Sequence, residues 1–218
     1  MLHIFNGLAT HRLHSRFTDV VPVKPLPSQG RLVLVFLAVF AACAMELFAV
    51  MDKTGFHLMT QAQMGCMGAI LASGGIMFSL ALAWRMVPAS RQGFPVSFVL
   101  ALSGIGVIGG IALLFPWQTS SSFVSEGRPC AVMELMIAIP AAVIFWLLAR
   151  RGALVASAGL GAALTGLAVF LALTPLQTQG MFQQAPHLLV WHGATAAILI
   201  GLGALIGDCL GRFGPRFR

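Results

Sequence analysis

Six apolar stretches, each long enough to cross a lipid bilayer, fill most of this chain and limit what it can fold into. A membrane-spanning helix needs about 20 apolar residues. Stretches of this length cover residues 32–51, 62–84, 96–117, 131–149, 153–174 and 187–210. Only 9% of the 218 residues are charged and 58% are hydrophobic, whereas a soluble domain carries about 25% charged residues. The composition therefore excludes a water-soluble globule, and it excludes a disordered chain, which is poor in apolar residues.

The sequence predicts an all-α, polytopic membrane protein with three parts. Residues 1–31 form a cytoplasmic N-terminal segment, residues 32–212 a bundle of six transmembrane helices, and residues 213–218 a short basic tail. Eleven of the thirteen Lys and Arg residues lie in the N-terminal segment, the second and fourth connections and the tail. Because cytoplasmic loops carry the excess of Lys and Arg, we expect both termini in the cytoplasm. The net charge of +7 is explained in this way, so we expect no direct binding of nucleic acid.

Small residues spaced four apart predict where the helices pack closely. Such spacing lets the backbones of membrane helices approach one another, and it occurs in three of the stretches. The residues are Gly106 and Gly110, Ala162 and Gly166, and Gly203, Gly207 and Gly211. Asp208 precedes Arg212 by four positions, which predicts an ion pair on one helix face with no functional role.

Cys130, His187 and His192 are the residues that we expect to sense a signal at the outer face. Cys130 precedes the fourth stretch and the two histidines lie at the start of the sixth, so all three should lie at the same depth in the membrane, near its outer surface. Five residues at about 100° each separate the histidines by about 140° on an α-helix, so the two should diverge. Helix packing can still bring the Cys130 thiol to one of them. Thiolate and imidazole are good ligands for zinc-like or softer metals, but an unpaired thiol with two interfacial histidines explains the residues equally well, and we assign no metal.

Two carboxylates leave a rival interpretation open. Glu46 and Glu134 lie inside apolar stretches, where acidic residues often mark an ion or proton path. A small ion or solute transporter is therefore one alternative, and a membrane metal- or haem-binding protein that uses the histidines is another. The chain shows no phosphate-binding loop, no H-E-x-x-H and no nucleophile elbow. We expect no enzyme and no cofactor.

Several short motifs, in order along the chain, resemble the NrsF-like family of six-span membrane anti-sigma factors. These are VPVKPLP at 21–27 ahead of Arg31, MVPASR at 86–91, GRPC at 127–130, ARRGA at 149–153 and HLLVWH at 187–192. The resemblance implies a protein of the bacterial inner (cytoplasmic) membrane whose N-terminal segment holds an extracytoplasmic-function sigma factor inactive. An outer-face stress signal would release the sigma factor.

The same resemblance assigns the sigma-binding residues and shows one departure. The residues that match the family's N-terminal motif are Pro22, Val23, Lys24, Leu26 and Arg31. Relatives commonly carry a second cysteine a few residues before the position of His187. Here residues 177–182 read QTQGMF, so a two-cysteine sensor is in doubt for this chain.

Overall fold

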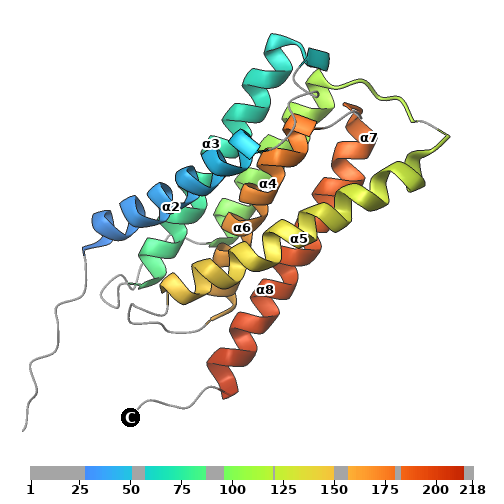
Figure 1. Cartoon of the computed structure of the whole chain (residues 1–218). Helices are drawn as coiled ribbons and strands as arrows, with labels where there is room; N and C mark the ends of the chain where they lie inside the picture. The colour runs from blue at the N-terminus through green and yellow to red at the C-terminus, as the bar shows by residue number, and fades with distance from the viewer. Residues whose placement is uncertain are drawn as a thin grey trace, which may run out of the picture.

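The computed structural model describes residues 28–50, 57–86, 96–119, 121–149, 157–179 and 183–213, and every regular element within them is helical (Figure 1). The elements in chain order are α2 (Gln29–Val50), α3 (Gln61–Met86), α4 (Val96–Leu114), α5 (Phe123–Ala149), α6 (Ala158–Gln179), α7 (Ala185–His187), η2 (Leu188–Gly193) and α8 (Ala194–Phe213). The all-α prediction is confirmed for the described residues, and each of the six apolar stretches contains a helix.

Five of these helices are long and apolar enough to cross a membrane. They are α2, α3, α4, α5 and the continuous run of α7, η2 and α8. The sixth expected span corresponds to α6, whose apolar part, Ala158–Thr174, is shorter. The first residue of α2 and the last residue of α8 lie at the same end of the bundle (Figure 1).

Helix α6 forms the centre of the bundle. It contacts α2, α3, α4, α5 and α8, and its residues from Leu160 to Ala172 are buried with the exception of the half-buried Thr165. Its small side chains explain this position, because a Cβ on Gly161 would overlap the carbonyl oxygen of Gly203 in α8. A Cβ on Gly207 would likewise lie 3.0 Å from the backbone of Gly161. The predicted close packing through Gly203 and Gly207 is thus confirmed, whereas the space around Gly106 is open.

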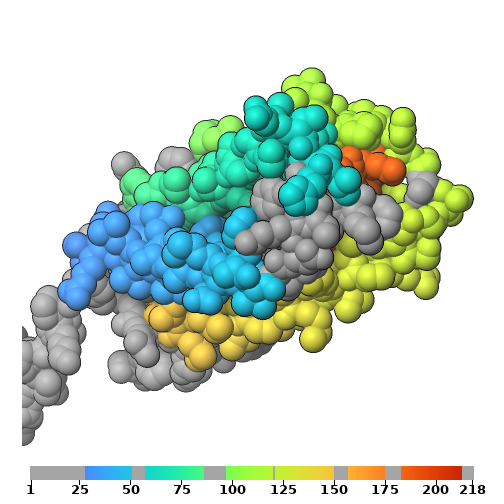
Figure 2. Space-filling view, turned by 45° about the horizontal axis from the view of Figure 1, so that its top comes forward, coloured from blue at the N-terminus to red at the C-terminus, as the bar shows by residue number. Residues whose placement is uncertain are grey.

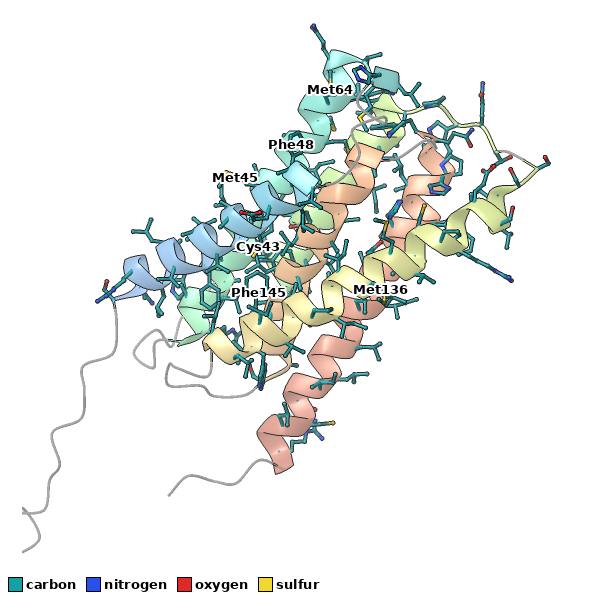
Figure 3. The ribbon with its side chains drawn as sticks, in the orientation of Figure 1. Cys43, Met45, Phe48, Met64, Met136 and Phe145 are labelled. Atoms are coloured by element: carbon teal, nitrogen blue, oxygen red, sulfur yellow. The ribbon has the colours of Figure 1, made fainter. Side chains whose placement is uncertain are left out.

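Aromatic rings fill the interior, and large apolar side chains cover the outside. The Phe36 and Phe145 rings join α2 to α5 with centroids 6.4 Å apart. Figure 3 shows Phe145 on the side of α5 that faces α2, and Met136 on the outward side. Met136 is 72% exposed, and exposed Leu, Ile and Val side chains occur on α2, α3, α4, α5 and α8. This pattern is typical of helices that face lipid.

The N-terminal sigma-binding prediction lies mostly outside the described residues. Pro22, Val23, Lys24 and Leu26 are outside them, whereas Arg31 is exposed in the first turn of α2. Its backbone N–H donates a hydrogen bond to Ser28 Oγ at 3.4 Å. At the other end of the chain, Asp208 and Arg212 form the predicted ion pair at 2.8 Å.

One predicted boundary is wrong. Helix α5 begins at Phe123, eight residues before the expected start at 131, and Cys130 lies inside it. Glu126 in the first turn favours this earlier start, because a carboxylate there complements the partial positive charge of a helix N-terminus. The Ser122 hydroxyl donates a hydrogen bond to that carboxylate.

Candidate functional site

A π-helical turn brings the two histidines together, so the prediction that they diverge is wrong. Residues Leu188–Gly193 form the π-helix η2, and the N–H of Ala194 donates to the carbonyl of Leu189, five residues back. Hydrogen bonds of this i→i+5 type place residues five apart one above the other. The ring centroids of His187 and His192 are accordingly 5.6 Å apart. The prediction assumed the α-helical angle at every residue.

Local contacts explain how this segment is held. Pro186 stands in the first turn of α7, a position that proline suits because the N–H it lacks has no partner there. The N–H of Ala185 donates to the carbonyl of Pro116 at 2.9 Å, which ties the start of α7 to the residues after α4. Both histidine side chains are buried, and Figure 2 shows only a small orange-red part of this segment between green and yellow-green ones.

Cys130 completes a cluster with both histidines. The Cys130 Sγ and one ring nitrogen each of His187 and His192 all lie within 4.8 Å of one another. The thiol is half-buried and donates to the Glu126 carbonyl at 3.6 Å. The predicted approach of Cys130 to a histidine is thus confirmed, and it extends to the second histidine. These three residues could hold a metal ion, and we name them the thiol–imidazole cluster.

Glu134 is part of this arrangement; the sequence marks it as a candidate transport carboxylate and does not predict its contact with His192. Its side chain is completely buried, and its Oε2 accepts a hydrogen bond from His192 Nδ1 at 3.1 Å. Among the described residues its Oε1 has no hydrogen-bond partner. The bond to Nδ1 leaves Nε2 as the His192 nitrogen available to the thiol. A carboxylate that fixes the orientation of an imidazole in this way is common in metal sites and in nucleophile–histidine–carboxylate triads.

Aromatic side chains cover the cluster. The Phe123 ring meets the His187 ring edge-on at 6.4 Å and lies 5.9 Å from the Trp191 ring. Trp191 packs directly over Gly127, where a Cβ would overlap the indole. Trp191 is therefore half-buried against α5.

A large cavity of about 930 Å³ adjoins the thiol–imidazole cluster. Side chains of α3, α4, α6 and α8 supply an apolar lining that includes Ile70, Leu100, Ile111, Phe170 and Ile200. Most polar lining residues come instead from the first turns of α5 and from the segment around α7 and η2. They are Glu126, Cys130, Gln183, His187 and His192. The cavity is thus mostly apolar, with its polar groups gathered near the cluster.

The two carboxylates of the transporter alternative lie in different surroundings. Glu46 is exposed on α2, whereas Glu134 is buried between α5 and η2. The described residues therefore do not bring the pair into one site.

Comparison with known families identifies the group to which the chain is related. The family NrsF, described as negative regulator of sigma F, matches residues 17–213. The chain belongs to the NrsF family. The match includes the N-terminal motif from Pro22 to Arg31, every described helix and all members of the thiol–imidazole cluster. NrsF proteins are regulators rather than catalysts by this description. No curated protein and no solved structure matches the chain significantly.

Proposed function

We propose that this NrsF protein is a six-span anti-sigma factor of the bacterial inner membrane that sequesters an extracytoplasmic-function sigma factor. The observation that carries the proposal is the family match over residues 17–213. Five helices of membrane-spanning length and the excess of Lys and Arg on one side of the expected topology support the location. Both termini are then cytoplasmic.

The N-terminal segment, residues 1–31, is the part proposed to bind the sigma factor and to block its contact with RNA polymerase. It is the largest polar segment of the sequence, and it contains three prolines within residues 21–30. A proline-rich polar segment that orders on binding gives modest affinity per unit of buried area. A second contact of the sigma factor with the membrane bundle would add avidity.

Deletion of residues 2–27 tests this assignment directly. The truncated protein keeps every described helix, and we expect it to reach the membrane and to leave the sigma regulon constitutively active in a reporter strain. Deletion of residues 214–218 removes basic residues at the other terminus and is the matched control, which should repress normally. Continued repression by the first variant, with membrane insertion confirmed, would show that another part of the protein inhibits the sigma factor.

The thiol–imidazole cluster is the proposed site at which the releasing signal acts. It combines a half-buried thiol with two buried imidazoles from a different helix, so a ligand there contacts both α5 and η2. Release requires a signal with different affinity for two states of the bundle, and the π-helical turn supplies an element with two arrangements. Cys130→Ser should abolish induction by thiol-reactive oxidants or soft metals while basal repression and protein level stay unchanged.

A second cysteine provides the control for this substitution. Cys209 is exposed near the end of α8, away from the cluster, so Cys209→Ser should leave induction intact. An unchanged induction profile in Cys130→Ser would remove Cys130 from the sensing mechanism. Because the cluster also suits a resident metal, an absorbance spectrum of the purified protein with added Co²⁺ tests the alternative of a metal-binding protein.

A further inference from the structure

We propose that the cavity beside the thiol–imidazole cluster binds a lipophilic electrophile, an apolar molecule with an α,β-unsaturated carbonyl head that adds to the Cys130 thiol. This inference rests on the proposed sensing function and names the chemical class of the signal. The candidates within that class are long-chain 2-alkenals and quinones with hydrocarbon tails.

The size and lining of the cavity favour an apolar ligand over a bare ion. Its volume of about 930 Å³ lies at the upper end of the range for sites that enclose drug-sized ligands, about 300–1,000 Å³. Gly104 of α4 and Gly201 of α8 line it, and a Cβ on either residue would meet no atom within 4 Å. A metal ion held by the cluster needs none of this volume, whereas a hydrocarbon chain fills it.

The cluster supplies a nucleophile with a proton acceptor beside it. The Cys130 Sγ lies within 4.8 Å of a ring nitrogen of each histidine, and the carboxylate of Glu134 fixes His192 through Nδ1 at 3.1 Å. A thiol is activated when an adjacent imidazole accepts its proton and a third group orients that imidazole. Cys130 and both histidines line the polar part of the cavity wall, where the head of an amphiphile would lie.

The reaction balances without any further reagent. A bond forms between Cys130 Sγ and the β-carbon of the ligand, and the π bond between the α- and β-carbons breaks. Its electron pair moves towards the carbonyl oxygen, and the thiol proton passes through an imidazole to the resulting enolate, which becomes a saturated carbonyl. With a quinone the same addition gives a hydroquinone thioether. No group leaves, and no external oxidant or reductant takes part.

The test compares probes that share the head group and differ in the tail. Full-length protein in lipid nanodiscs is treated with an alkyne-tagged long-chain 2-alkenal, with acrolein, or with a benzoquinone that carries a tagged hydrocarbon tail. Modification of each cysteine is followed by mass spectrometry. The rate with the long-chain alkenal relative to the rate with acrolein should be several-fold higher at Cys130 than at other cysteines, because burial of the tail drives binding, whereas the higher intrinsic reactivity of acrolein acts equally on every thiol.

Cys43 and Cys66 are internal controls for partition of the probes into lipid. Both lie within apolar helices, so they experience the same membrane concentration of probe. Their preference for the long chain should be several-fold smaller than that of Cys130. Equal chain-length preference at all three cysteines would overturn the inference. The alkenal and quinone arms differ in the head, and the arm with the larger preference for Cys130 over Cys43 and Cys66 identifies the head that the cavity favours.

Variants that fill the cavity provide the decisive comparison. Gly104→Leu and Gly201→Leu should slow modification by the long-chain probes about ten-fold, because the tail can no longer be buried, while acrolein still reacts. Gly106→Leu and Gly109→Leu are the controls, because a Cβ there also meets open space but neither residue lines the cavity. Wild-type labelling rates in both filled variants would refute the cavity as the binding site.

Failure of this inference is distinguishable from failure of the proposed function. If the filled variants label like the wild type while Cys130→Ser still blocks induction, the sensing role stands and the lipophilic ligand is wrong. If Cys130 is labelled with the expected chain-length preference but the adduct does not release the sigma factor, the cavity is a binding site and the sensing role is wrong.

Discussion

The buried hydrogen bond between Glu134 and His192 should be worth more than an exposed ion pair of shorter length in the same chain. The Glu134 and His192 side chains are 0% and 10% exposed and are 3.1 Å apart, whereas Asp208 and Arg212 are 41% and 71% exposed and are 2.8 Å apart. By distance alone, the exposed pair would have the stronger interaction. Burial reverses the order, because water and salt screen the exposed charges.

The expected magnitudes follow from the surroundings of each pair. Hydrogen bonds between membrane helices average about 0.6 kcal/mol and reach about 1.7 kcal/mol. A carboxylate acceptor in a fully buried site belongs near the upper limit, so we expect a coupling of about 1.5 kcal/mol between Glu134 and His192. An exposed i,i+4 pair contributes about 0.3–0.5 kcal/mol, which sets the expectation for Asp208 and Arg212.

A double-mutant cycle measures each coupling directly. The variants are Glu134→Ala, His192→Ala and their combination, with the corresponding alanine cycle for Asp208 and Arg212. Unfolding in mixed micelles of mild detergent and SDS is followed by far-ultraviolet circular dichroism. The reasoning is refuted if the buried cycle is additive within about 0.5 kcal/mol, the usual scatter for independent sites, or if the exposed pair couples more strongly.

Three further predictions follow from other parts of the bundle. Gly161→Ala should destabilise the protein by about 1–3 kcal/mol, the usual cost of overpacking, whereas Gly106→Ala should stabilise it by up to about 1 kcal/mol through helix propensity. Unfolding in detergent measures both changes in stability, and changes of the same sign would contradict the α6–α8 contact. Deletion of Val190 should restore an α-helix with the histidines four residues apart and still on one face. A cysteine that replaces either histidine should form a disulfide with Cys130 on oxidation, both in the full-length chain and in the deletion variant. Loss of the disulfide in the deletion variant would contradict the extra π-helical residue between the histidines. Reporter fusions after alternate connections should test the six-span topology, and a fusion after residue 151 that reports the outer side would exclude it. Fusions expected to report the cytoplasm follow Gln92, Arg151 and Arg218, and those expected to report the outer side follow Thr54, Ser121 and Gln179.

The helices were predictable because a long apolar run has few alternatives in lipid. In a bilayer every backbone N–H and C=O must be paired within the protein, which an isolated segment achieves only as a helix. The start of α5 was not predictable by this rule, because polar residues, including Glu126 and Arg128, interrupt the apolar run near its start. Proline inside a helix removes one hydrogen bond, so Pro129 indicates that the helix begins after it. The favourable charge of Glu126 at the N-terminus is a weaker signal in the sequence.

The thiol–imidazole cluster was predictable only in part. Topology places the start of the fourth and sixth stretches at the same end, which brings Cys130 near the histidines. The pairing of His187 with His192 was not predictable, because a spacing of five residues indicates opposite faces unless a π-helical turn is known. Glu134 is 58 positions from His192, and a lone buried carboxylate carries no sequence signal for its partner.

In the continuous run of α7, η2 and α8, we expect the π-helical turn to be the part that changes while the rest stays fixed. The α8 residues that follow η2 are held against α6, where Gly203 and Gly207 contact the backbone of Gly161. This part of α8 therefore cannot rotate without overlapping α6. Conversion of η2 to an α-helix would turn the preceding residues by about 100°, the angle of one helical residue, and would carry His187 away from Cys130. A ligand that engages Cys130 and displaces His187 therefore favours the α-helical arrangement. Because a ligand shifts an equilibrium only by its different affinity for the two states, oxidants, soft metals and thiol adducts should release the sigma factor only where they bind the α-helical arrangement more tightly.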